Sequence, residues 1–206
     1  MEPIIFLVDD EEEVRATLSR ALKMRGFKVK AFSTAEQFLN AYQTNEVGCL
    51  VLDYGMPGMN GLQLQSELNE RGISVPVIFI SGHGGVPESV QAMKGGAVDF
   101  IQKPFRQAQL VKCIESAFEI DSVNRVREAG EEQALEKFER LTLREREIAD
   151  LIITNPSFTT SKHIGRELEI SPRTVDHHRA RILEKLEINS LAELIDLAAR
   201  IDSALI

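Results

Sequence analysis

Acidic, hydroxyl and basic side chains follow the short apolar runs of the first half of the sequence. Asp9 and Asp10 follow the first run and Asp53 follows the third. Ser81 and Lys103 follow the fourth and fifth. If these runs are neighbouring parallel strands, the five side chains meet at one edge of a sheet, since sites in open α/β sheets lie at the carboxyl ends of strands. Polar loops after strands explain any one of the five, but they explain all five together poorly.

Three carboxylates, a hydroxyl and an ammonium suit a magnesium-assisted transfer of a phosphoryl group onto a carboxylate. Mg²⁺ takes oxygen ligands and keeps several of its waters. A carboxylate can be the nucleophile and form an acyl phosphate, while a lysine and a hydroxyl neutralise and orient the phosphoryl oxygens. A bound cation would offset the repulsion between Asp9 and Asp10. Glu11–Glu13 would start a helix, where the dipole favours each acid by roughly 0.3–1 kcal/mol.

The elements that must position these side chains alternate between strand and helix. Five apolar runs are predicted to be strands: Ile4–Val8, Phe27–Phe32, Cys49–Leu52, Val77–Ile80 and Val98–Ile101. Helical periods separate them, as in the spacing of Val14, Leu18 and Leu22. This alternation predicts a doubly wound α/β domain, in which helices cover both faces of a five-stranded parallel sheet.

The second half of the sequence is helical throughout. Capping boxes begin at Thr142 and Ser190, and Ser171 precedes a proline that suits the first turn of a helix. With a short helix over Ser161–Leu168, the pattern predicts an all-α domain of four helices. The expected limits are a first domain at 1–120, a helical linker at 121–140 and the four-helix domain at 141–206. The linker could break at Gly130, and a disordered acidic tether is the alternative.

Composition sets bounds on the class of protein. The 206 residues carry a net charge of −8, and none of the three parts 1–120, 121–140 and 141–206 is basic overall. By itself this composition argues against strong nucleic-acid binding. No stretch approaches the roughly 18 apolar residues of a membrane span. The acidic N-terminal run argues against a secretory signal, and the two cysteines have no CxxC spacing. We therefore expect a cytoplasmic protein without a membrane partner.

Four segments of the first domain resemble the receiver domain of bacterial two-component response regulators, over about residues 3–120: LVDDEEEV, VLDYGMPGMNG, FISGHG and DFIQKPF. The resemblance implies the flavodoxin-like strand order 2-1-3-4-5. It implies that Asp53 is the phosphoacceptor, assisted by Ser81 and Lys103, and that Ser81 and Phe100 form the switch. Core packing is an equal alternative for Phe100. The resemblance also implies a cis bond before Pro104 and Mg²⁺ as the cofactor. The implied metal site consists of Asp9, Asp10, Asp53 and the carbonyl of Gly55.

The helical half resembles the LuxR-type helix-turn-helix domain of the NarL and FixJ regulators, over about residues 139–206. The segments LTLREREIADLI and SKHIGRELEISPRTVDHHRARILEKL carry the resemblance. The helix that begins at Pro172 would place a polar stripe in the major groove of DNA. The expected DNA-binding residues are Lys162, Arg173, Thr174, Asp176, His177, Ala180, Arg181 and Lys185. A solvated helix face is the alternative, although residues 162–185 are locally basic. Residues 153–160 depart from the family pattern, because they are longer and lack its glycine.

Together these resemblances predict a response regulator that accepts a phosphoryl group on Asp53 from a sensor histidine kinase. It would then bind double-stranded promoter DNA, as a homodimer when phosphorylated, with RNA polymerase as a further partner. It would not be an enzyme beyond its own phosphorylation and dephosphorylation. An apolar stripe on the last helix would supply the pairing surface: Leu191, Leu194, Ile195, Ala198, Ile201 and Leu205. The alternative is that this stripe closes the core of its own domain. Control of aromatic (styrene) catabolism is the expected regulon, although no residue establishes it.

Two alternatives come from other classes of protein. The first is a phosphorylation-gated interaction module that binds protein and no DNA. The second is an aspartyl-phosphate phosphatase of the haloacid-dehalogenase class. Those enzymes carry a second acid two residues after the nucleophile, and position 55 is glycine here, so the proton donor is missing.

Overall fold

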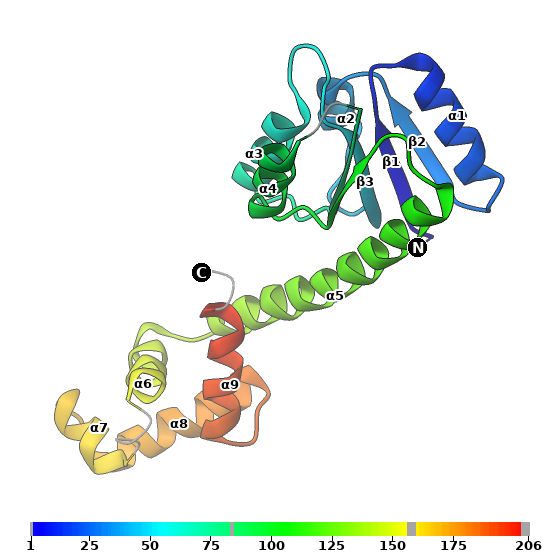
Figure 1. Ribbon diagram of the computed structural model, residues 1–206. Helices are drawn as coiled ribbons and strands as arrows, with labels where there is room; N and C mark the ends of the chain where they lie inside the picture. Colours follow the sequence, from blue (N-terminus) through cyan, green and yellow to red (C-terminus); the bar gives the residue numbers. More distant parts are fainter. Residues whose placement is uncertain (1, 83–84, 156–159, 203–206) are drawn as a thin grey trace. The chain divides into compact units, whose positions relative to one another are not determined.

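The computed structural model describes residues 2–82, 85–155 and 160–202. The chain forms two compact units, residues 1–125 and 126–206, each with its own hydrophobic core. The division falls within one helix, α5, which runs unbroken over Gln107–Glu139 (Figure 1). Gly130 lies inside this helix, so α5 is not interrupted at the glycine. A single glycine lowers helix stability by only about 1 kcal/mol relative to alanine, which a helix of this length tolerates. The domain limits at residues 120 and 140 stay a prediction.

Unit 1 is a five-stranded parallel sheet in the order β2-β1-β3-β4-β5, which confirms the predicted order. Its strands are β1 (Ile4–Val8), β2 (Lys28–Phe32), β3 (Gly48–Asp53), β4 (Val77–Ser81) and β5 (Asp99–Gln102). Its helices are α1 (Glu12–Lys23), α2 (Ala35–Ala41), α3 (Gly61–Glu70), α4 (Val86–Lys94) and the first part of α5. Each end of the five predicted strands lies within one residue of the observed end.

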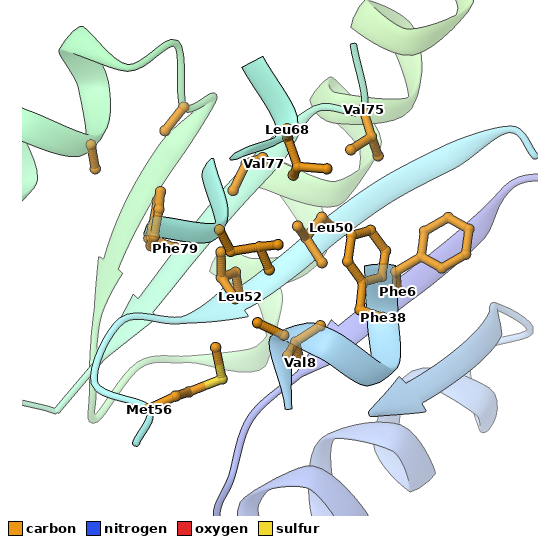
Figure 2. Packing of buried hydrophobic residues seen from close by; sticks show 14 residues of the cluster. Phe6, Val8, Phe38, Leu50, Leu52, Met56, Leu68, Val75, Val77 and Phe79 are labelled. Atoms are coloured by element: carbon orange, nitrogen blue, oxygen red, sulfur yellow. The ribbon is translucent and has the colours of Figure 1, made fainter. Parts of the chain in front are cut away.

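Unit 1 has a core on each face of the sheet, because successive side chains of a strand point to opposite faces. Phe6 and Val8 of β1 pack with residues of α2, α3 and α4. Ile5 and Leu7 of the same strand pack on the other face with residues of α1 and α5. Figure 2 shows the first of these cores, in which the rings of Phe6 and Phe38 meet edge to face with centroids 5.7 Å apart. The sheet is therefore covered on both faces, as predicted.

Two side chains of α5 pair with the edge of unit 1 where β3 begins. Asp121 is buried, and its Oδ2 accepts hydrogen bonds from the Gly48 N–H and from Arg125 Nε, each at 2.9 Å. Arg125 also donates to the carbonyls of Thr44, at 3.1 Å, and Glu46. A Cβ at Gly48 would lie 1.8 Å from the carbonyl oxygen of Ile4, so only glycine fits this close approach. We call these contacts the Asp121 anchor.

Unit 2 is all-helical, as predicted. It contains the last part of α5 followed by α6 (Leu143–Thr154), α7 (Ser161–Glu167), α8 (Pro172–Leu186) and α9 (Leu191–Asp202). The end of α5 is held by ion pairs from Lys137 (2.9 Å) and Arg140 (3.5 Å) to Glu187, which follows α8. A Cβ at Gly165 would lie 2.7 Å from the carbonyl oxygen of Ile170, so glycine lets α7 approach the turn before α8.

The core of unit 2 is formed by buried side chains from each of its helices. Its fully buried members include Ile148, Ile164, Val175, Ile182 and Leu194. Part of the apolar stripe on α9, Leu194 and Ala198, thus closes the core of its own unit, and Leu205 lies outside the described residues. Within the described ranges, no helix is both long and apolar enough to cross a membrane.

Candidate functional site

The five side chains singled out in the sequence lie at the carboxyl ends of four neighbouring strands. Asp9 and Asp10 follow β1, Asp53 ends β3, Ser81 ends β4 and Lys103 follows β5. The Lys103 N–H donates to the carbonyl of Ser81 at 2.7 Å, which holds the end of β5 beside β4. The peptide bond between Lys103 and Pro104 is cis, which confirms that prediction.

The Lys103 ammonium bridges the two buried acids of this edge. Its Nζ lies 2.7 Å from Asp53 Oδ1, 3.0 Å from Asp9 Oδ2 and 3.8 Å from Glu11 Oε1. Burial lowers the pKa of Lys103, but hydrogen bonds to Asp53 and Asp9 outweigh it and the pKa is raised above its usual value. Burial raises the pKa of Asp9, and the hydrogen bond from Lys103 opposes this only in part. Lys103 therefore stays charged and acts as the counterion of the site.

The three aspartates differ in how their oxygens are used. Asp9 is fully buried, and its Oδ1 accepts the Glu11 N–H at 2.9 Å while Oδ2 accepts from Lys103. Asp53 is 6% exposed, and its Oδ2 accepts the Gly55 N–H at 2.7 Å. Asp10 is exposed to solvent. The carboxylates of Asp53 and Asp9 are thus held by hydrogen bonds within the protein, whereas Asp10 is accessible to solvent.

The donor set of this edge fits Mg²⁺ by its chemistry. Carboxylate and carbonyl oxygens are the ligands that Mg²⁺ takes, usually one or two carboxylates completed by waters. In the described parts of the chain no three acidic, histidine or cysteine side chains already form a closed metal cage. Lys103 instead occupies the space between Asp9 and Asp53. Among these acids Asp10 is exposed, so its carboxylate is accessible to a hydrated cation from solvent.

The two expected switch residues lie next to this edge. Ser81 is 2% exposed at the end of β4. Phe100 is half-buried on β5, stacked on Phe79 with centroids 6.1 Å apart and edge to face with Tyr54 at 6.2 Å. Tyr54, which contacts Phe100, directly follows Asp53 in the sequence, so Phe100 is linked to the acid through one aromatic ring. The same contacts are those of an aromatic side chain that only packs in the core. Both interpretations of Phe100 stay open.

A residue that the sequence analysis did not single out also contacts the β1–α1 loop. Arg15 Nη1 donates to the carbonyl oxygens of Asp9 at 2.8 Å and Asp10 at 3.2 Å. The sequence feature that could have indicated this contact is that Arg15 is the first basic residue after five consecutive acids.

The face of α8 that was expected to bind DNA is largely exposed. Arg173, Thr174, His177, Ala180 and Arg181 are exposed on α8, and Lys162 is exposed on α7. Residues 156–159, the middle of the segment that departs from the family pattern, lie outside the described residues.

Two of the expected DNA-binding residues make contacts inside unit 2. Asp176 accepts a hydrogen bond from the Ser161 hydroxyl, which in turn accepts from Arg179 at 3.0 Å. Lys185 Nζ lies 2.6 Å from Glu145, which is 5% exposed, and donates to the carbonyl of Arg140 at 3.1 Å. Asp176 thus joins α7 to α8, and Lys185 joins α8 to α6.

We expect Lys185→Ala to destabilise unit 2 in a pH-dependent way. Burial raises the pKa of Glu145, but hydrogen bonds from Lys185 and Thr142 outweigh it and the pKa lies below its usual value. A lowered folded pKa stabilises above the unfolded value of about 4.3, and this contribution is lost as pH falls through the folded pKa. Because Lys185 is partly exposed, we expect a loss of about 1–3 kcal/mol near neutral pH that shrinks in acid.

Amide hydrogen exchange of α8 in the full chain measures this effect. Arg173→Ala is the control, since it removes an equal charge from an exposed position of the same helix. A loss of protection that stays constant from neutral to acid pH would contradict the role given to the Lys185–Glu145 pair.

Comparison with known proteins identifies the class that this fold and this edge define. Residues 5–115 match the response regulator receiver domain, and residues 139–198 match the bacterial regulatory proteins of the luxR family. The chain therefore belongs to the response regulators that join a receiver to a LuxR-type DNA-binding domain. It is a transcriptional regulator of the FixJ and NarL type, a conclusion that these matches favour over the protein-interaction module.

Individual relatives are similar to this chain along nearly its whole length. The response regulator protein TodT of Pseudomonas putida is 36% identical over 98% of this chain and 88% of its own length. The transcriptional regulatory protein FixJ of Rhizobium meliloti is 40% identical over 94% of both chains. A low-resolution structure of the response regulator StyR is 38% identical, covers 97% of this chain and all of its own, and superposes with a TM-score of 0.79.

Proposed function

We propose that Asp53 accepts a phosphoryl group from a sensor histidine kinase and that this modification controls the binding of promoter DNA by unit 2. The observation that carries the proposal is the ammonium of Lys103 held between Asp53 and Asp9, at 2.7 and 3.0 Å. A fixed positive charge beside the acid is what an incoming phosphoryl group requires, because charge gathers on its oxygens during transfer.

The phosphoryl step uses the side chains in separate roles. A carboxylate oxygen of Asp53 forms the new bond to phosphorus, while the bond from phosphorus to the donor breaks and its electron pair leaves with the donor. Lys103 moves from neutralising the carboxylate to neutralising the phosphoryl oxygens. The Gly55 N–H holds the other oxygen of Asp53, which fixes the direction of attack. Ser81, at the end of the adjacent strand, would supply a hydroxyl to the new phosphoryl group.

Mg²⁺ would be held by Asp10, Asp53 and the carbonyl of Gly55, with Asp9 beside it. When bound, it supplies the positive charge that balances the phosphoryl oxygens and the crowded acids. After transfer, Ser81 and Phe100 would act as the switch that transmits the phosphorylated state of Asp53 to the outer faces of the receiver. In these roles the chain assists only its own phosphorylation and dephosphorylation, and it is not otherwise an enzyme.

Unit 2 would insert α8 in the major groove, with Arg173, Thr174, His177, Ala180 and Arg181 facing base edges and phosphates. Lys162 of α7 would contact the backbone. Since Lys185 and Asp176 are engaged within the unit, we propose that they act by positioning α8. A dimer would double the phosphate contacts of a unit whose net charge is negative. RNA polymerase as a partner and a cytoplasmic location fit this role. Control of styrene catabolism stays a prediction.

Operator binding with and without phosphorylation tests the proposal. We expect acetyl phosphate with Mg²⁺ to raise the affinity of the full chain for genomic fragments that it selects, and to steepen the salt dependence as a dimer forms. Arg181→Ala should weaken binding by about 1–3 kcal/mol or reduce the salt slope by about 1, without changing phosphorylation. Arg25→Ala, an exposed arginine of unit 1, is the control with an equal charge change.

Two results would overturn parts of this proposal. Equal affinities and equal salt slopes in both states would mean that the receiver does not control DNA binding. A phosphorylated protein that selects and binds no genomic fragment would instead point to the protein-interaction alternative.

A further inference from the structure

The guanidinium of Arg15 holds the backbone of the loop that carries the acids. Arg15 lies in the first turn and a half of α1 and is half-buried. Its Nη1 reaches back to the carbonyls of Asp9 and Asp10 at 2.8 and 3.2 Å, while its own N–H donates to the carbonyl of Glu11 at 2.9 Å. The Arg15 side chain therefore contacts two of the three residues that connect β1 to α1, Asp9 and Asp10.

This loop is a place where the backbone needs such support. The loop and the first turn of α1 together carry five consecutive carboxylates. Two unit charges 4 Å apart repel by roughly 4 kcal/mol at an effective dielectric constant of 20. Glu11 occupies the position before the helix without a side-chain cap. Asp9 is anchored through both carboxylate oxygens. Asp10 is exposed, and its carbonyl accepts a hydrogen bond from Arg15.

We propose that Arg15 is a positioning residue for the divalent-cation site, which deepens the proposed function and rests on it. By fixing the carbonyls of Asp9 and Asp10, its guanidinium sets the direction in which the Asp10 carboxylate leaves the loop. Arginine suits this task because its guanidinium is planar and rigid, so the N–H groups of Nη1 have fixed directions. Groups that orient metal ligands without touching the metal change metal affinity about 10–100-fold when removed.

The direction of the change in Mg²⁺ affinity on removal of Arg15 distinguishes a positioning role from a purely electrostatic effect of its charge. Arg15 is itself a cation near a site for a cation, so electrostatics alone predicts that its removal tightens Mg²⁺ binding. Positioning predicts the opposite. A role confined to helix stability would change unfolding in the absence of Mg²⁺ and leave the affinity for Mg²⁺ unchanged.

The test measures Mg²⁺ binding to the full chain by titration calorimetry, in parallel with its thermal stability without Mg²⁺. We expect Arg15→Ala to weaken Mg²⁺ binding about tenfold or more, and Arg15→Lys, which keeps the charge but not the fork, to fall between it and the wild type. Arg20→Ala is the matched control, since Arg20 is an exposed arginine on the same helix. At saturating Mg²⁺, Arg15→Ala should be phosphorylated by acetyl phosphate at the wild-type rate.

Each outcome has a defined meaning. Tighter or unchanged Mg²⁺ binding by Arg15→Ala would overturn the positioning role, and so would an equal weakening by Arg20→Ala. A phosphorylation defect that persists at saturating Mg²⁺ would also overturn it, because the guanidinium would then act on the transfer itself. Failure of the proposed function is distinguishable, since the wild type would then show neither Mg²⁺ binding nor phosphorylation.

Discussion

Asp53→Asn is expected to abolish phosphorylation of the full chain by acetyl phosphate. An amide of the same shape can keep its place beside Lys103 and the Gly55 N–H, yet it is not a nucleophile. Intact-mass spectra of the wild type with Mg²⁺ should show one added phosphoryl group that is lost in alkali, as acyl phosphates are. The variant should show none under the same conditions.

The matched control is Asp99→Asn, which makes the same chemical change on β5, where Asp99 Oδ2 lies 3.0 Å from Cys113 Sγ. This variant should accept one phosphoryl group like the wild type. An alkali-stable adduct on Ser81 or another hydroxyl, or continued labelling of Asp53→Asn, would assign the acceptor to a different residue.

The second large effect is expected from Asp121→Ala, which removes the centre of the Asp121 anchor. The buried N–H of Gly48 and the guanidinium of Arg125 would both lose their acceptor. Breaking a buried, hydrogen-bonded charge pair costs about 3–5 kcal/mol, and because Arg125 is partly exposed we expect roughly 2–4 kcal/mol. Unfolding of unit 1 should occur at correspondingly lower urea concentration.

Tyrosine fluorescence follows this unit selectively. Both tyrosines of the chain, Tyr42 and Tyr54, lie in unit 1, and there is no tryptophan. Asp121→Asn is the control, because its amide oxygen can still accept the Gly48 N–H, and it should lose clearly less stability than Asp121→Ala. Equal losses in the two variants would mean that the charge pair with Arg125, and not the bond to Gly48, sustains the anchor.

The sheet and the members of its carboxyl edge were predictable because their signals are local. Strand periodicity and the residue after each strand locate Asp53, Ser81 and Lys103 at one edge, since parallel strands end together. The bridge that Lys103 makes between Asp9 and Asp53 follows from this arrangement once the strands are in order. No contact between distant segments has to be guessed for that part of the site.

The remaining contacts depend on which side chains meet across the fold, and spacing does not encode them. Lys185 lies one helical turn after Arg181, so its position on α8 suggests the same exposed stripe. Only the approach of α6, with the buried acid of Glu145, turns it inward. Likewise, five acids in a row predict a cation nearby, but they do not say that Arg15 reaches back to the carbonyls of the loop.

Contacts made in the middle of α5 and just around its last turn also indicate where this chain tolerates recombination with its relatives. Among the residues that the structure describes, the hydrogen-bond partners of Asp121 and Arg125 lie in unit 1, and Lys137 and Arg140 pair with Glu187 in unit 2. A hybrid regulator spliced at residue 120 or 140 would separate one of these groups from its partners. A splice near Gly130 leaves both sets intact, so sensory and output modules should be exchanged there, in the same helical phase.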